Sequence, residues 1–236
     1  EPGMIPLIFL HGGGENLAAK QIAYSAIVRA VRAHENGRFV LVLAGETTTD
    51  MEKWCPLYIG EFVQAGALPS NIVTCFLLQD KPLTRAMLEA LAPQGIFVCG
   101  GHTPLYQKGM CSDPGVGEYL QENNVVYGGL SAGAMIAPTR AIVGGCAIAR
   151  GGIPRQISVR DEGQALELLT VRDGLDLVPF SVDVHATQAG MLSRMIHAVD
   201  TGAVERGCAI DEDTMLLIEG TRATVSGIGH VYHMTR

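Results

Sequence analysis

The sequence predicts an α/β fold in which a doubly wound, mainly parallel sheet carries helices on both faces and is closed by antiparallel C-terminal strands. Short, continuous apolar runs of the length of buried strands alternate with segments of helical periodicity. Three of these runs also end in glycine-rich loops, at residues 11–14, 100–103 and 128–134. Because the loops after the carboxyl ends of parallel strands meet along one edge of a sheet, we expect these three loops to lie together.

The predicted elements of the first half follow this alternation. Buried strands are predicted at residues 5–10, 39–43, 72–77, 95–99 and 124–127. Helices are predicted after the loop at 11–14 and at residues 58–65, 83–91 and 116–121, and residues 45–50 are predicted to form a polar loop. Parallel strands joined through helices imply right-handed crossovers.

The second half is predicted to be less regular. Residues 141–149 and 151–154 are predicted to be irregular or strand-like, residues 164–169 to form a helix, and residues 177–184 a strand that ends at His185. An amphipathic helix follows at 191–199, and short antiparallel strands are predicted at 208–210, 214–218, 223–226 and 230–234. Since nothing repeats and no linker interrupts the chain, residues 1–236 are predicted to form one domain, with residues 1–3 set apart as a tag remnant.

Composition excludes several classes of protein. Hydrophobic residues make up 47% of the chain and charged residues 17%, which excludes a disordered chain. The net charge is −7 and no Lys/Arg cluster occurs, so a nucleic-acid partner is not expected. Neither a membrane-spanning stretch nor a signal peptide is predicted. The six cysteines have no metal-ligand spacing, so we expect reduced thiols in a cytoplasmic protein without a metal.

A strand-to-helix junction around Ser131 is the strongest chemical signal. The sequence Gly-Leu-Ser-Ala-Gly at 129–133 fits a nucleophile elbow, a sharp turn that holds a serine hydroxyl at the mouth of a sheet. The N–H of Ala132, at a helix N-terminus, would then be free to face a developing oxyanion. The competing interpretation is a small-residue turn that happens to contain a serine.

A serine nucleophile needs a base, and His185 is the strongest candidate. It directly follows a buried apolar strand, which is expected to place its imidazole on the same sheet edge as Ser131. His34 and His197 are expected to be solvated, and His230 and His233 to be ordinary strand residues. His11 and His102 lie in glycine-rich loops near the expected site, where they could contact substrate or be solvated.

The residues alone do not decide which carboxylate orients the imidazole of His185. The loop at 210–214 carries three carboxylates between two apolar strands, a pattern more typical of a solvated hairpin. Asp183 is the rival, because it lies two residues before His185 and shares its face of the strand. A lipase-like α/β-hydrolase is a further alternative, with His11-Gly-Gly-Gly as the oxyanion loop and His230 or His233 as the base. That fold places several strands before its His-Gly-Gly-Gly loop, whereas only one precedes it here.

Five segments in order resemble a known family. They are FVCGGHT at 97–103, GLSAGA at 129–134, VDVH at 182–185, LSRM at 192–195 and GCAIDEDT at 207–214. Together they resemble the cyanophycinase/aspartyl dipeptidase (dipeptidase E) family of serine peptidases. The resemblance implies a class I glutamine amidotransferase-like, flavodoxin-like fold, with serine in place of the nucleophilic cysteine.

The resemblance also implies roles for individual residues. Ser131 would attack the carbonyl, His185 would be general base and then general acid, and Glu212 would be the acid of the triad. The N–H groups of Gly101 and Ala132 would form the oxyanion hole.

The residues predicted to bind substrate are His102, Thr103, Arg194 and Asp183. The chain departs from cyanophycinases here, because Val184 replaces a glutamine and Ala-Gly-Met at 189–191 replaces substrate-holding arginines. His102 also replaces an amide-bearing residue. A guanidinium grips a carboxylate with two hydrogen bonds, which these replacements cannot do.

These observations predict a cytoplasmic serine peptidase-like hydrolase that cleaves a peptide or amide bond through an acyl-enzyme, with no metal or cofactor. The expected partner is a short peptide or amide, with no nucleic acid or membrane partner, and the family's habit makes a homodimer a candidate assembly. The alternative is a non-catalytic or amidotransferase-like domain that keeps the fold and binds a small molecule or partner.

Overall fold

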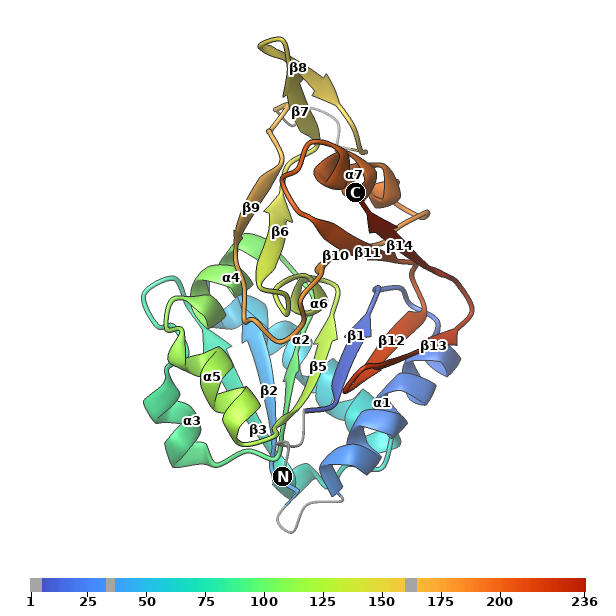
Figure 1. The fold of residues 1–236 in the computed structure, drawn as a ribbon. Helices are drawn as coiled ribbons and strands as arrows, with labels where there is room; N and C mark the ends of the chain where they lie inside the picture. The colour runs from blue at the N-terminus through green and yellow to red at the C-terminus, as the bar shows by residue number, and fades with distance from the viewer. Residues whose placement is uncertain (1–5, 33–36, 160–164) are drawn as a thin grey trace.

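The computed structural model describes residues 6–32, 37–159 and 165–236, with a seven-stranded sheet at its centre (Figure 1). The strand order is β13-β12-β1-β5-β4-β2-β3, in which β1 to β5 run parallel to one another and β12 pairs antiparallel with both β1 and β13. The strands are β1 (Ile8–His11), β2 (Phe39–Ala44), β3 (Ile72–Leu77), β4 (Gly95–Val98), β5 (Val126–Leu130), β12 (Thr214–Glu219) and β13 (Arg222–Gly227). The predicted doubly wound, mainly parallel fold is therefore confirmed.

The direction of the chain decides which helices cover which face. From β1 the chain moves through β2 to β3 and then reverses to β4 and β5. Because parallel crossovers are right-handed, the first two helices lie on one face and the next three on the other. In keeping with this, α1 packs on α2, while α3 and α4 both pack on α5 (Figure 1). The bounds are α1 (Leu17–Arg32), α2 (Thr48–Gln64), α3 (Arg85–Leu91), α4 (Thr103–Cys111), α5 (Gly115–Glu122) and the 3₁₀ turn η1 (Pro69–Asn71).

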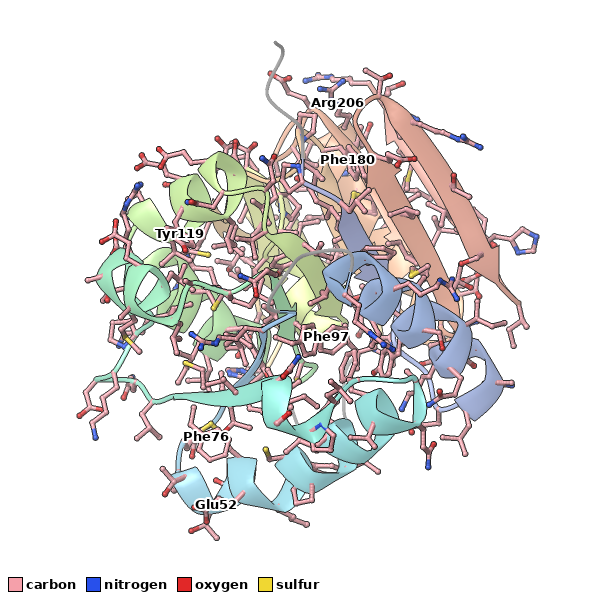
Figure 2. All side chains as sticks on the ribbon, turned by 90° about the horizontal axis from the view of Figure 1, so that it is seen from below. Glu52, Phe76, Phe97, Tyr119, Phe180 and Arg206 are labelled. Carbon is pink, nitrogen blue, oxygen red and sulfur yellow. The ribbon has the colours of Figure 1, made fainter. Side chains whose placement is uncertain are left out.

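An aromatic cluster fixes α1 and α2 against the sheet. Phe97 of β4 is fully buried in the interior (Figure 2) and lies 4.8 Å, centroid to centroid, from the ring of Phe62 on α2. Tyr24 of α1 stacks on Phe62 at 4.4 Å. Edge-to-face and stacked pairs of this kind add about 0.5–1.5 kcal/mol each beyond the burial of their area. The carboxyl ends of the strands are thereby held at fixed positions relative to α2.

Helix α2 begins ten residues before the predicted start at residue 58. The Thr47 side chain accepts a hydrogen bond from the Asp50 N–H at 3.2 Å, and its hydroxyl donates to the Asp50 carboxylate at 2.7 Å. This reciprocal cap turns the predicted polar loop into the first turn of the helix. Pro56 lies inside α2, although a proline in a sequence ordinarily indicates a helix end.

A second, three-stranded sheet lies above the first in Figure 1. It consists of β10 (Ser181–Val184), β11 (Arg206–Ile210) and β14 (Val231–Thr235), with α7 (Met191–Asp200) packed against it. Of the strand predicted at 177–184, only the last four residues form a strand, because Pro179 has no N–H to donate. His185 therefore follows a strand of this second sheet, and the expectation that it belongs to the sheet of Ser131 is wrong.

The rest of the chain forms two hairpin-like pairs and one short helix. The pairs are β6 (Arg140–Gly144) with β9 (Thr170–Asp173) and β7 (Ala147–Arg150) with β8 (Ile153–Gln156), and the helix is α6 (Ala132–Met135). The helix predicted at 164–169 is wrong over its described residues, because Glu167 and Leu169 hydrogen-bond to the backbone at 146–147. Residues 1–3 and His34 lie outside the described residues, and the single domain over 1–236 stays a prediction.

Candidate functional site

Ser131 occupies a strained turn between β5 and α6. Its backbone has φ 51° and ψ −108°, a region that L-residues rarely adopt. Both neighbouring glycines are required by close backbone approach. A Cβ at Gly129 would lie 2.5 Å from the Gly133 carbonyl, and one at Gly133 would lie 2.1 Å from the Val98 carbonyl oxygen. This is the geometry of a nucleophile elbow, with the hydroxyl presented at the rim of the sheet.

Ser131, His185 and Glu212 form a continuous chain of side-chain contacts. Ser131 Oγ lies 2.9 Å from His185 Nε2, and His185 Nδ1 lies 2.8 Å from Glu212 Oε1. The side chains of His185 and Glu212 are about one third exposed, so the group is open to a substrate on one side. A hydroxyl, a base and an orienting carboxylate in this order are able to activate the hydroxyl as a nucleophile.

The glycine loop at 12–14 brings the three contributing segments together. The His185 N–H donates to the Gly12 carbonyl at 3.1 Å, and the Asp213 N–H donates to the Gly13 carbonyl at 2.7 Å. A Cβ at Gly13 would lie 2.2 Å from His185 Cε1. The loop thus serves as the surface on which the base and the acid loop rest, and side chains at these positions would push the imidazole away.

The acid loop is held by polar contacts of its own. The Asp211 carboxylate accepts hydrogen bonds from the Thr187 N–H and hydroxyl, at 3.0 and 2.7 Å, and from the His230 N–H at 2.9 Å. Burial raises the pKa of Asp211, but the bonds from Thr187 and His230 outweigh it and hold the pKa below its usual value. The Glu212 N–H donates to Gln188 Oε1 at 3.0 Å. Sequence reasoning did not identify Thr187 and Gln188, although both closely follow His185.

Two backbone N–H groups are available beside Ser131. Ala132 is the first residue of α6, so its N–H has no partner within that helix. A Cβ at Gly100 would lie 3.5 Å from Ser131 Cβ, so the loop after β4 approaches the serine from the other side. Within the described part of the chain, the Gly101 N–H makes no hydrogen bond. The pair can therefore accept an oxyanion formed at a carbonyl that Ser131 attacks.

Asp183 and Arg194, both predicted to bind substrate, form a buried ion pair instead. The guanidinium donates from Nε and Nη2 to the two Asp183 oxygens, each at 2.7 Å, and from Nη1 to the Gly145 carbonyl at 3.2 Å. Asp183 is fully buried and Arg194 is 8% exposed. Burial lowers the pKa of Arg194, but Asp183 more than compensates and raises it. Asp183 is therefore also not the acid that contacts His185, because its carboxylate is turned to α7.

His102 and Thr103 lie at the rim, beside Gly101. His102 is exposed and precedes α4 without a side-chain capping bond, whereas the Thr103 hydroxyl contacts the Met135 sulfur at 3.7 Å. Substrate contact by these two residues stays a prediction. His230 is 78% exposed at its side chain and His233 is exposed, and His185 is the histidine that contacts Ser131. This arrangement does not support the lipase-like alternative. His197, expected at the surface, is half-buried.

His11 is buried behind the site and is held neutral. Its Nδ1 accepts a hydrogen bond from the Gly13 N–H at 3.2 Å, and burial lowers its pKa from 6.5 to about 4. In the unfolded chain the imidazole binds a proton near pH 6.5, whereas in the folded protein it stays neutral down to about pH 4. The stability that depends on neutral His11 is therefore complete above pH 6.5 and is lost as the pH falls toward 4.

We expect urea unfolding to show this loss directly. Between pH 7 and pH 5 the free energy of unfolding should fall by about 2 kcal/mol more in the wild type than in His11→Asn, which cannot titrate. Asp211 does not interfere, because its depressed pKa affects stability only at pH values near and below its usual 3.8. Equal pH slopes for the two proteins would contradict the assignment of a neutral, buried His11.

Within residues 6–32, 37–159 and 165–236, no three His, Cys, Asp or Glu side chains are grouped so as to hold a metal ion. All six cysteines are free thiols. Over the same ranges, the helices are too short or too polar to cross a bilayer.

Comparison with curated proteins identifies related sequences. No family model matches the chain. A cyanophycinase from Synechococcus elongatus is 30% identical over 136 residues, and one from Thermosynechococcus vestitus matches equally. Over these 136 residues the chain is similar in sequence to cyanophycinases. The match covers 53% of this chain but only 36% of each cyanophycinase, so the chain spans about a third of the length of these relatives.

Solved structures resemble the chain in fold over nearly its whole length. A peptidase from an acI-B1 Actinobacterium superposes with a TM-score of 0.69 at 18% identity, covering 100% of this chain and 96% of the other. A protein from Listeria monocytogenes EGD-e, named as a putative Peptidase E, superposes with a TM-score of 0.55 at 16% identity. The superposition covers 95% of this chain and 99% of the other. At these identities the likeness concerns the fold alone. The sequence match confirms the predicted resemblance to cyanophycinases, and the two solved structures confirm the predicted fold.

Proposed function

We propose that the chain is a serine hydrolase that cleaves a peptide or amide bond through an acyl-enzyme on Ser131. The observation that carries the proposal is the pair of contacts at His185, 2.9 Å to the Ser131 hydroxyl and 2.8 Å to the Glu212 carboxylate. The similarity in sequence to cyanophycinases and in fold to solved peptidases supports the choice of an amide over an ester. The cytoplasmic location and the homodimer stay predictions.

The proposed reaction proceeds in two halves. His185 Nε2 takes the Ser131 proton while Oγ bonds to the carbonyl carbon, and the resulting oxyanion accepts hydrogen bonds from the N–H groups of Gly101 and Ala132. His185 then gives the proton to the leaving amine as the C–N bond breaks, which leaves an ester on Ser131. Water attacks this ester with His185 again as the base, and the acid product departs while the proton returns to Ser131. Glu212 orients the imidazole and stabilises its charged form in both halves.

Labelling with a fluorophosphonate tests this function without knowledge of the substrate. We expect the reagent to label Ser131, and we expect Ser131→Ala to remove the label. His185→Ala should slow labelling by at least about 10³-fold, because the hydroxyl loses its base. Ser70→Ala and His233→Ala, which alter an exposed serine and an exposed histidine, are the matched controls and should label like the wild type.

Two outcomes would contradict the proposal. A folded wild-type protein that does not react at Ser131 would favour the non-catalytic or amidotransferase-like binding domain. Loss of labelling in His233→Ala but not in His185→Ala would instead favour the lipase-like arrangement.

A further inference from the structure

A cavity of about 360 Å³ lies beside the site and shares Gly101 with the proposed oxyanion hole. It is lined by the end of β2, the first half of α2, and the loop and helix that follow β4. Its volume falls within the range of pockets that hold small ligands, about 300–1,000 Å³. Its largest lining side chains are Met51, Trp54, Tyr58 and Tyr106.

The fold itself opens this cavity. β2 and β4 are neighbours in the sheet, but α2 leaves β2 toward one face and α4 leaves β4 toward the other. A crevice therefore forms between the carboxyl ends of the two strands, at the point where the winding of the chain reverses. In open α/β sheets, such switch points are where ligands bind.

The cavity adjoins the nucleophile through Gly100. A Cβ on Gly100 would lie 3.5 Å from Ser131 Cβ and 3.7 Å from the Tyr58 hydroxyl. Tyr58 accepts a hydrogen bond from the Gly100 N–H at 3.3 Å, and the Tyr106 hydroxyl donates to the Gly100 carbonyl at 3.0 Å. The same tyrosines that line the cavity therefore fix the strip of backbone that separates it from Ser131.

The lining is suited to an apolar side chain. Trp54 is 53% exposed, although it is the largest apolar side chain that the sequence offers, and it lines the cavity. Lys53 Nζ lies over the ring, 5.6 Å from its centroid, so the part of the ring that Lys53 leaves uncovered is available to a ligand. The charged lining residue is Asp50, whose carboxylate accepts from the Thr47 hydroxyl as part of the helix cap. Among the described residues that line the cavity, none is Lys, Arg or His. A carboxylate placed there would find no positive partner among the lining residues and would face Asp50, which is unfavourable.

We name this cavity the Trp54 pocket, and we propose that it binds a large apolar or aromatic side chain of the substrate. This proposal rests on the proposed hydrolase function. The carbonyl oxygen of the scissile peptide bond would lie between the N–H groups of Gly101 and Ala132. The Trp54 pocket begins at Gly100 and Gly101, next to that position. The side chain it receives is therefore that of the residue whose carbonyl is attacked. The substrate class is a peptide with an apolar residue on the acyl side of the scissile bond, not one with an acidic residue there.

Diphenyl α-aminoalkylphosphonates test the Trp54 pocket, because one reactive phosphorus group carries a chosen acyl-side side chain. We expect the benzyl compound, with the side chain of phenylalanine, to inactivate the protein at least tenfold faster than the carboxymethyl compound, with that of aspartate. Trp54→Ala should reduce this ratio at least fivefold. Leu57→Ala, which removes another exposed apolar side chain of α2 outside the pocket, is the matched control and should keep the ratio.

The fluorophosphonate separates the two proposals, because it carries no amino-acid side chain. Normal fluorophosphonate labelling with no preference between the phosphonates, or with a preference for carboxymethyl, would overturn the pocket and leave the hydrolase standing. A preference for a guanidino side chain that disappears in Asp50→Asn would also overturn it, in favour of a cation subsite. Failure of both reagents would overturn the hydrolase proposal, and the pocket with it.

A second measurement needs no catalysis, because Trp54 is the sole tryptophan of the chain. In Ser131→Ala, binding of a leucine-containing dipeptide should change the Trp54 fluorescence in a saturable way. The matching aspartate-containing dipeptide should give no saturable change at the same concentrations. Equal responses to the two dipeptides would contradict an apolar pocket.

Discussion

Glu212→Gln should lower the rate of Ser131 acylation by about 10⁴-fold while the protein stays folded. The carboxylate accepts from His185 Nδ1–H at 2.8 Å, which keeps Nε2 free to accept the serine proton. A glutamine amide can donate to Nδ1 instead, and the proton then moves to Nε2, where it blocks the base. Gln also cannot stabilise the imidazolium that forms as Ser131 attacks. The exchange removes a charge but keeps the size of the side chain.

The measurement is the second-order rate constant of fluorophosphonate labelling, with circular dichroism and urea unfolding to verify the fold. Glu219→Gln, the same exchange at the exposed end of β12, is the matched control and should label at the wild-type rate. Asp211→Asn should weaken folding through the lost contacts to Thr187 and His230, but it should not by itself produce the 10⁴-fold effect. A Glu212→Gln protein that labels normally would show that Glu212 does not act through His185.

Arg194→Met should destabilise the folded protein by about 3–5 kcal/mol. The substitution removes the partner of Asp183, which is fully buried, and leaves an uncompensated carboxylate in the core. For a protein of this size we expect the melting temperature to fall by roughly 10 °C. The double variant Arg194→Met/Asp183→Leu should recover much of the loss, because it removes the stranded charge as well.

Arg140→Met is the matched control for this experiment. Arg140 pairs with Asp173 at 2.6 Å, but both side chains are more than half exposed, so its loss should cost at most about 1 kcal/mol. If Arg194 held the substrate instead, Arg194→Met would leave the melting temperature unchanged and raise KM. That result would restore the role that the family resemblance implied for this residue.

The sequence predicts the candidate catalytic residues better than it predicts the residues that bind the substrate. The strands before the three glycine-rich loops are continuous apolar runs, so their burial and parallel arrangement follow from local pattern alone. Ser131, His185 and the acidic loop each follow such a strand, and the family motifs point to Glu212 among the three carboxylates. Without the motifs, the local pattern favoured a solvated hairpin, because the bonds to Thr187 and Gln188 join separate segments.

The misassigned residues share a physical cause. Arg194 and Asp183 both resemble ligand-binding groups in sequence, and only the packing of α7 against β10 decides that they neutralise each other. The start of α2 depends on a side-chain cap at Thr47 that outweighs the helix-ending signal of Pro56.

By itself the sequence determined the α/β class, the buried strands, and Ser131 and His185 as candidates, because each depends on the pattern of residues within a few positions. The tertiary structure alone decided which contacts hold the acidic loop against His185, which charges cancel in the core, and where the Trp54 pocket opens. These depend on how elements distant in the chain pack together, and on the reversal of winding between β2 and β4, which no local pattern encodes.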